Sequence, residues 1–227
     1  MTRPLADELL DRLVRAFTAA RDPERAERAA AYMRDQFAFL GLSAPTQRTL
    51  ARGVLAGLPA PTEEELRTVV LACWDLAERE YQYFACDWLR RHVAVPGPEF
   101  LATARTLITV RSWWDTVDPL ATRFVGGLVR RHPRLSAEMD AWSAEENLWL
   151  VRTAILHQLN YGAETDTDRL FGYCTRQAGH RDFFVRKAIG WALRQYARTD
   201  ADAVRHYLAR HGDALSPLSV REASKHL

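Results

Sequence analysis

The sequence has no segment that would place it in a membrane or in a secretory pathway. Its longest apolar runs are far shorter than the ~18 residues at which a membrane-spanning helix becomes a candidate, so we expect no association with a membrane. The N-terminal stretch carries acidic residues at a helical period instead of one uninterrupted apolar run, which is not the pattern of a signal peptide. A cytoplasmic location is therefore the default expectation.

Cysteine is scarce, with only Cys73, Cys86 and Cys174 in 227 residues. The odd count, the wide spacing and the lack of a CxxC pair argue against both a disulfide framework and a zinc site. Each cysteine lies in an apolar helical context, so we expect three buried small side chains in a reducing compartment. No metal site is expected.

Lysine is almost absent: of 31 basic residues only Lys187 and Lys225 are lysine. The guanidinium group of arginine binds phosphate oxygens well, which is one explanation for the excess of arginine over lysine. A genome whose codon usage favours arginine produces the same excess, and the sequence leaves both explanations open. The net charge of +2 is small for a dedicated DNA-binding protein, and the two halves of the chain are nearly balanced. Any basic surface must therefore be created by folding.

Helical periodicity is the main feature that the sequence does have. Apolar residues recur with a period of 3.6 almost throughout, and no alternating strand pattern appears, which predicts an all-α fold. One helix is expected to open at Asp22-Pro23 and to carry Tyr32 and Phe37, and another to open with a capping box at Thr62 and Glu65. The other predicted helices span residues 4–20, 46–56, 80–93, 99–109, 119–131, 136–142, 144–159, 166–177, 183–198, 202–210 and 219–226.

Short connections between these helices predict antiparallel neighbours. Similar helical segments return at intervals of roughly 35–40 residues, which fits the two-helix unit of HEAT-like repeats. With no linker in view, we expect a single domain over residues 1–227, built as a curved α-solenoid of antiparallel HEAT-like helix pairs. An arginine-lined concave face would suit a rod-shaped polyanion.

The segment SWWDTVDP, residues 112–119, is the most unusual in the chain. Two adjacent tryptophans point in different directions on any regular backbone, so one packing site does not account for both. Trp114 and Asp118 are four residues apart and share a face if the turn is helical. The alternative interpretation is structural, because an aspartate before Pro119 is a natural helix N-cap and a tryptophan is usually a core residue.

Two further positions have competing interpretations. Arg152 stands in the apolar stretch LWLVRTAIL, where it either extends to the surface or is held for an anion or a carboxylate. Gly190 lies in mid-helix beside Trp191, where glycine costs about 1 kcal/mol relative to alanine. That cost indicates close approach of another group to this face, and helix-on-helix packing explains it equally well.

Taken together, these segments resemble the AlkD-like family of DNA alkylation repair enzymes, a class of HEAT-like repeat DNA glycosylases. The resemblance rests on YMRDQFAFLGL, SWWDTVD, WLVRTAILHQL and FFVRKAIGWALRQYA, which follow the family's order over about residues 30–200. By matching position, it assigns the catalytic aspartate to Asp118, its aromatic partners to Trp114 and Trp191, a phosphate-binding arginine to Arg152, and a tyrosine of the same cleft to Tyr32.

The same segments lead us to expect further DNA contacts at Trp113, Arg186, Lys187 and Arg194. The resemblance implies a monofunctional glycosylase of base excision repair that acts on double-stranded DNA containing alkylated bases. A solenoid that cradles DNA can act alone, so we expect a monomer. Its expected reaction is hydrolysis of the N-glycosidic bond of cationic N3- or N7-alkylated purines (3-methyladenine, 7-methylguanine or bulkier adducts) without base flipping. A cationic base is already a good leaving group, so the reaction needs a carboxylate to stabilise the sugar cation and no metal or organic cofactor.

Two alternatives stay open. The first is a self-resistance glycosylase specialised for a bulky adduct of a DNA-alkylating natural product. The second is a non-catalytic HEAT-like module that binds DNA or protein, and an Asp118 buried as an N-cap and facing away from Trp191 would favour it. Lyase chemistry at abasic sites is not expected, because two lysines leave few candidates for an amine nucleophile.

Overall fold

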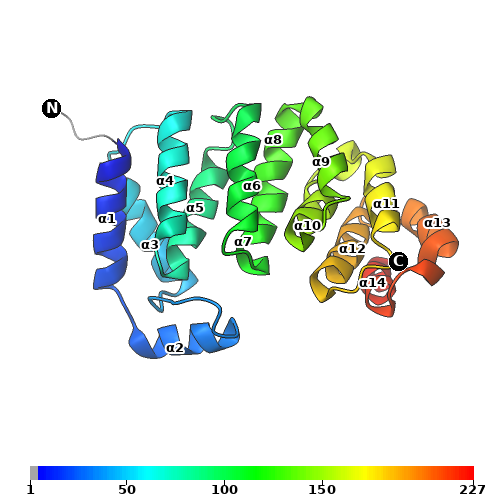
Figure 1. Ribbon diagram of the computed structural model, residues 1–227, viewed down its shortest axis with the longest axis horizontal. Helices are drawn as coiled ribbons and strands as arrows, with labels where there is room; N and C mark the ends of the chain where they lie inside the picture. Colours follow the sequence, from blue (N-terminus) through cyan, green and yellow to red (C-terminus); the bar gives the residue numbers. More distant parts are fainter. Residues whose placement is uncertain (1–4) are drawn as a thin grey trace. The chain divides into compact units, whose positions relative to one another are not determined.

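The computed structural model describes residues 5–227, and over that range all regular elements are helical, apart from one parallel bridge between Ala38 and Glu78 (Figure 1). The all-α prediction is confirmed. The chain divides into two compact units, unit 1 (Met1–Phe100) and unit 2 (Leu101–Leu227), which are described separately. The solenoid and the single domain stay predictions, and the expected helix start at Pro4 lies outside the described residues.

In unit 1, α1 packs against α3 and α4, while α2 lies across the direction of α1 (Figure 1). Leu9, Leu13 and Phe17 are buried at intervals of four, which gives α1 the apolar stripe that faces its neighbours. The helices of unit 1 are α1 (Leu5–Ala19), α2 (Pro23–Tyr32), α3 (Ala44–Leu55), α4 (Glu63–Asp75), α5 (Arg79–Arg91) and the short 3₁₀ helix η1 (Pro98–Phe100).

The helix starts of unit 1 follow their local signals. The backbone N–H of Glu65 donates to the Thr62 hydroxyl at 3.2 Å, and the Thr62 N–H donates to the Glu65 carboxylate at 2.8 Å, so the predicted capping box is confirmed. The expected extension of α2 to Phe37 is wrong. The helix ends at Tyr32, because Arg34 and Asp35 adopt left-handed backbone angles with φ of 57° and 55°.

A buried carboxylate that sequence reasoning missed organises the loop between α2 and α3. Glu80, at the start of α5, accepts hydrogen bonds from the backbone N–H groups of Leu40 (2.9 Å), Gly41 (2.8 Å) and Leu42 (3.1 Å). Gly41 has φ 87°, and a Cβ there would lie 2.1 Å from the carbonyl oxygen of Asp22. The motif FAFLGL is therefore a loop held by a carboxylate, closely packed on the start of α2.

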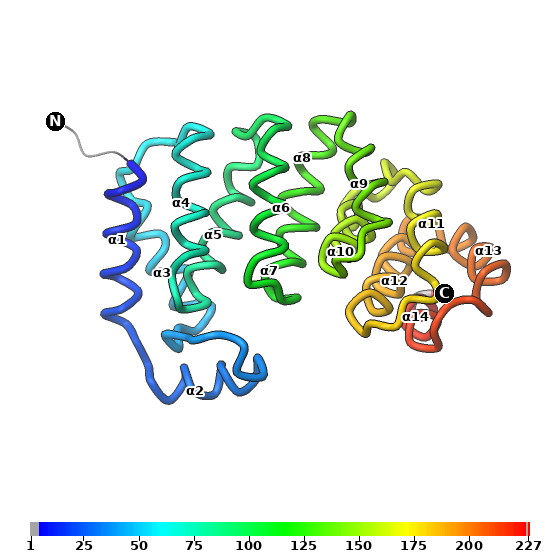
Figure 2. Tube along the Cα trace, viewed as in Figure 1, coloured from blue at the N-terminus to red at the C-terminus, as the bar shows by residue number. Residues whose placement is uncertain are grey.

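In unit 2, α10 packs against α6, α7, α9, α11 and α12, which makes it the central helix (Figure 2). The helices are α6 (Leu101–Thr109), α7 (Trp114–Pro119), the π-helical segment η2 (Leu120–Val125), α8 (Gly126–Arg131), α9 (Ser136–Trp142), α10 (Leu148–Leu156), α11 (Thr167–Arg176), α12 (Phe183–Tyr196), α13 (Ala201–His211) and α14 (Pro217–Ala223). Short 3₁₀ turns are η3 (Pro133–Leu135), η4 (Gly162–Glu164), η5 (Gly212–Ala214) and η6 (Ser224–His226).

Cys73, Cys86 and Cys174 are buried and form no disulfide, as predicted. Among the described residues, none of the helices is long and apolar enough to span a bilayer, and no group of three potential metal-ligating side chains occurs.

Candidate active site

The segment that carries Trp114 and Asp118 is helical from its first tryptophan. Arg111, with φ 51°, turns the chain, Trp113 is extended, and α7 begins at Trp114 and runs on through Pro119 into η2 and α8. Proline has no N–H to donate, and the wider π-helical turn follows directly after it. Trp114 and Asp118 therefore lie one helical turn apart on one face, and both are half-buried.

The interpretation of Asp118 as a helix N-cap, and with it the predicted helix start at residue 119, is wrong. The N-cap of α7 is Trp113, and Asp118 lies inside the helix. Its backbone carbonyl accepts a hydrogen bond from the Thr122 hydroxyl at 2.8 Å, a contact typical of helix interiors. The Asp118 carboxylate is thus available for contacts beyond its own helix.

That carboxylate is held by Arg152 of α10. The guanidinium donates from Nε to Oδ1 at 2.7 Å and from Nη2 to Oδ2 at 2.8 Å, a bidentate ion pair. It also donates from Nη1 to the backbone carbonyl of Phe184 on α12. Arg152 thereby joins three helices, and of the two interpretations of this arginine the one in which it is held for a carboxylate is confirmed.

Burial and pairing act on the Asp118 pKa in opposite directions. The Asp118 side chain is 16% exposed and that of Arg152 4% exposed. Burial raises the pKa of the Asp118 carboxyl above its ordinary value, and the Arg152 guanidinium opposes that rise. Because the guanidinium keeps its charge, it opposes the effect of burial at every pH at which the protein is folded.

An aromatic cluster surrounds the place where Arg152 meets α12. The ring of Trp113 lies 5.1 Å from that of Phe184 and 5.9 Å from that of Trp149, and the latter two rings are 5.0 Å apart. Trp113, for which we predicted a DNA contact, is half-buried in this cluster. The two adjacent tryptophans therefore do different things, because Trp113 packs between helices while Trp114 shares its face with Asp118.

Trp191 lies on α12, seven residues after Phe184, whose carbonyl binds Arg152. Seven residues make two helical turns, or about 10 Å along the helix axis, so Trp191 lies on the same face as Phe184. It is half-buried. The prediction that Trp191 and Asp118 line one cleft stays a prediction, as does the contribution of Tyr32, which is 74% exposed at the end of α2 in unit 1.

The predicted basic DNA contacts on α12 have partners within the protein. The Arg186 guanidinium donates from Nε to the His180 carbonyl at 2.7 Å. Lys187 and Arg194 both pair with Glu222 of α14, each at 2.9 Å. Their roles in DNA binding stay predictions. If they contact DNA, they do so from positions that are set by these partners.

Glu222 is the second buried carboxylate that sequence reasoning missed. It accepts from Lys225 at 2.7 Å as well as from Lys187 and Arg194, and Lys225 and Lys187 lower its pKa to about 2. Its short helix, α14, packs directly on Gly190. Of the two explanations for that glycine, close helix packing is therefore sufficient. The sequence signal for this helix is the N-cap Ser216 followed by Pro217, which predicts that a helix begins but does not indicate which helix it packs against.

The chain is similar to known proteins in sequence and in structure. A family model described as DNA alkylation repair enzyme matches residues 13–227. A solved structure described as a predicted DNA alkylation repair enzyme from Enterococcus faecalis is 33% identical, has a TM-score of 0.84, and covers 91% of this chain and 96% of its own. The crystal structure of smu.31 from Streptococcus mutans UA159 shares 15% identity at a TM-score of 0.61, covering 89% and 99%, and shows a similar fold alone. No curated protein matches significantly.

Proposed function

This chain belongs to the DNA alkylation repair enzyme family, and from that premise we propose that it is a monofunctional DNA glycosylase for cationic N3- and N7-alkylated purines in duplex DNA. The observation that carries the proposal is the Asp118 carboxylate, which shares a helical face with Trp114 and is fixed by two hydrogen bonds from Arg152. A carboxylate held in this way is preorganised for electrostatic catalysis.

The proposed reaction needs few catalytic groups besides the Asp118 carboxylate. A purine alkylated at N3 or N7 carries a positive charge and leaves without help from a general acid. Positive charge then develops on the deoxyribose, and a carboxylate near that carbon stabilises it and orients the attacking water. Arg152 engages each oxygen of Asp118 once, and the lone pairs that remain can face the sugar and the water.

Arg152 supports this role in two ways. It sets the direction of the carboxylate, and it opposes the rise in the Asp118 pKa that burial causes. Three of the five guanidinium N–H groups are used by Asp118 and Phe184, which leaves two for other acceptors. The phosphate contact expected from the sequence would use these two N–H groups. We therefore propose that Arg152 acts first by positioning the Asp118 carboxylate and second by binding a phosphate of the DNA.

Trp114 and Trp191 would present their ring faces to the sugar and to the cationic lesion. Contacts of this kind contribute about 0.5–2 kcal/mol each. The family resemblance implies that the lesion stays stacked in the duplex, so that no pocket limits its size and bulky cationic adducts are tolerated. The interior position of Asp118 in its helix also counts against the non-catalytic alternative, whose expected sign was an N-capping Asp118.

The decisive experiment compares Asp118→Asn with Asp115→Asn, a matched change in the same short helix. We expect the wild type and Asp115→Asn to release 7-methylguanine from methylated duplex DNA. Asp118→Asn should lose at least about a hundredfold in rate, as expected when preorganised charge is removed, while its affinity for the duplex changes little. Full base release by Asp118→Asn would refute the proposal. Competition between methylated and bulky-adduct duplexes then identifies the preferred lesion.

A further inference from the structure

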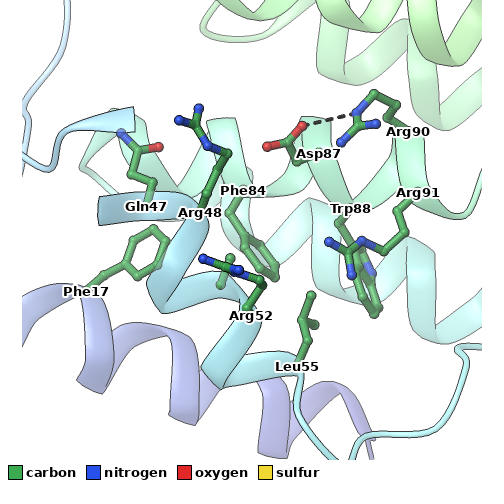
Figure 3. A pocket seen from close by; sticks show the side chains of 11 residues that line it. Phe17, Gln47, Arg48, Arg52, Leu55, Phe84, Asp87, Trp88, Arg90 and Arg91 are labelled. Carbon is green, nitrogen blue, oxygen red and sulfur yellow. Dashed lines mark hydrogen bonds and ion pairs between the residues drawn. The ribbon is translucent and has the colours of Figure 1, made fainter. Parts of the chain in front are cut away.

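Unit 1 contains a cavity of about 380 Å³ that the proposed catalytic residues do not line. Helices α1, α3 and α5 form its walls (Figure 3). Phe17, Leu55, Phe84 and Trp88 point toward one another and supply an apolar floor, in which the rings of Phe84 and Trp88 are stacked at 6.1 Å. A cavity of this size is at the small end of the range for ligand sites, so it suits one compact group.

Arginines surround this apolar floor (Figure 3). Arg48 and Arg52 come from α3, and Arg90 and Arg91 from α5. Asp87, the single acidic residue of the lining, is 3.2 Å from Arg90, and that pair is drawn as a dashed line. Among the described residues, Arg48, Arg52 and Arg91 have no acidic partner, so the rim carries uncompensated positive charge.

The combination of an arginine rim and an apolar floor indicates which chemical class of ligand the cavity can bind. Guanidinium forks bind phosphate oxygens in a planar, often bidentate geometry. The floor consists of the buried rings of Phe17, Phe84 and Trp88 and of the half-buried Leu55, an apolar surface that suits a base and that a free inorganic anion would leave unfilled. Gln47 adds a polar group to the wall; its Nε2 donates to the Leu42 carbonyl at 2.8 Å, and its side-chain oxygen can accept from a base edge.

We propose that this cavity binds one unpaired nucleotide of DNA, with the base against the apolar floor and the phosphate at Arg48 and Arg91. The inference rests on the proposed function, because a protein that acts on duplex DNA meets nucleotides whose partner base is missing or displaced. A base inside an intact duplex has its faces covered by stacking and cannot enter. The site therefore distinguishes an unpaired nucleotide from a paired one.

The test measures the affinity of the full chain for two duplexes that differ by one extra, unpaired thymidine in the middle of one strand. We expect the wild type to bind the duplex with the unpaired thymidine about tenfold more tightly, within the range of base–aromatic contacts. Ala51→Phe, which fills the cavity from α3, and Arg48→Ala should both remove this preference and keep the affinity for the paired duplex. Ala209→Phe and Arg210→Ala, both at exposed positions of α13, are the matched controls.

Competition separates the possible sources of the ligand. If thymidine 5′-monophosphate abolishes the preference, the site accepts a free nucleotide as well as one in a strand; if only the strand competes, the site requires the polymer. Equal affinity of the wild type for both duplexes, or a preference that survives both Ala51→Phe and Arg48→Ala, would overturn the inference. Equally effective competition by inorganic phosphate would overturn it too, because the site would then recognise only an anion.

Asp118→Asn makes the two proposals separable. It should lose base release and keep the preference for the unpaired thymidine, because Asp118 belongs to unit 2 and the cavity to unit 1. Failure of base release in the wild type would count against the proposed function alone, since the preference between the two duplexes does not depend on catalysis.

Discussion

Glu222 packs so closely on Gly190 that a Cβ on residue 190 would lie only 2.5 Å from the Cβ of Glu222. The carbonyl oxygen of Ser219 would be 2.8 Å away from the same atom. This close approach brings the Glu222 carboxylate to Lys187 and Arg194, which stand on either side of Gly190 along α12. The short C-terminal helix thus positions the helix that carries Trp191.

Gly190→Ala should therefore destabilise the protein. The added methyl group meets the backbone of α14, which cannot move aside as a flexible side chain would, and overpacking of this kind costs about 1–3 kcal/mol. Gly172→Ala in α11 is the matched control, because a Cβ there meets nothing within 4 Å. It should be neutral or stabilising by up to about 1 kcal/mol. Urea unfolding of both variants checks this, and equal stabilities would contradict the packing argument.

Arg152→Lys should lower both stability and base release. Lysine keeps the charge but cannot donate two parallel bonds to Asp118 and a third to the Phe184 carbonyl. We expect a loss of about 1–3 kcal/mol in unfolding free energy and at least a tenfold fall in kcat.

Arg169→Lys is the control for this change, because Arg169 also contacts both oxygens of an aspartate, Asp140, but in a more exposed setting. Exposed ion pairs contribute about 1 kcal/mol or less to the free energy of unfolding, so Arg169→Lys should lose less stability than Arg152→Lys. If Arg152→Lys costs no more than Arg169→Lys and leaves kcat unchanged, Arg152 does not position the carboxylate.

His157 should make the protein sensitive to acid. The side chain is buried in unit 2, its Nδ1 hydrogen-bonds the Ala154 carbonyl at 2.7 Å, and burial lowers its pKa from 6.5 to about 4. The unfolded chain therefore takes up a proton in a range where the folded chain does not. This contribution to stability is fully present above pH 6.5 and is lost as the pH falls toward 4, by at most roughly 3 kcal/mol.

His157→Gln should flatten the dependence of the unfolding free energy on pH across that window, measured by urea titration at several pH values. The same replacement at His206, which is exposed on α13, controls for the loss of an imidazole. An unchanged slope in His157→Gln would show that other groups cause the acid sensitivity.

Glu80→Gln should loosen the loop between α2 and α3. One carboxylate oxygen would be replaced by an amide NH₂, which would face a backbone N–H that now donates to Glu80. A donor left without its acceptor costs about 1–3 kcal/mol. Glu78→Gln, at the N-cap of the same helix and without a side-chain cap bond, is the control. Hydrogen exchange at Leu40 and Gly41 should accelerate in Glu80→Gln alone; equal protection in both variants would contradict the role of Glu80.

The sequence predicted the features that depend on neighbours along the chain. The all-α class follows from the 3.6-residue period, and the capping box at Thr62 and Glu65 follows from a pattern of four residues. The spacing of Trp114 and Asp118 also placed them on one face. A local signal was misleading at Pro119. An aspartate followed by proline is typical of a helix start, but here the helix had already begun five residues earlier, at Trp114.

The sequence by itself determined that this chain is helical, where several of its helices are capped, and which family its motifs resemble. The tertiary structure alone decided that Asp118 pairs with Arg152, that Glu80 holds the loop at Leu40, and that Glu222 packs on Gly190. Each of these contacts joins residues more than thirty positions apart. Periodicity and capping act over one or two turns, whereas the partner of a buried charge depends on which helices pack together, and no local pattern encodes that.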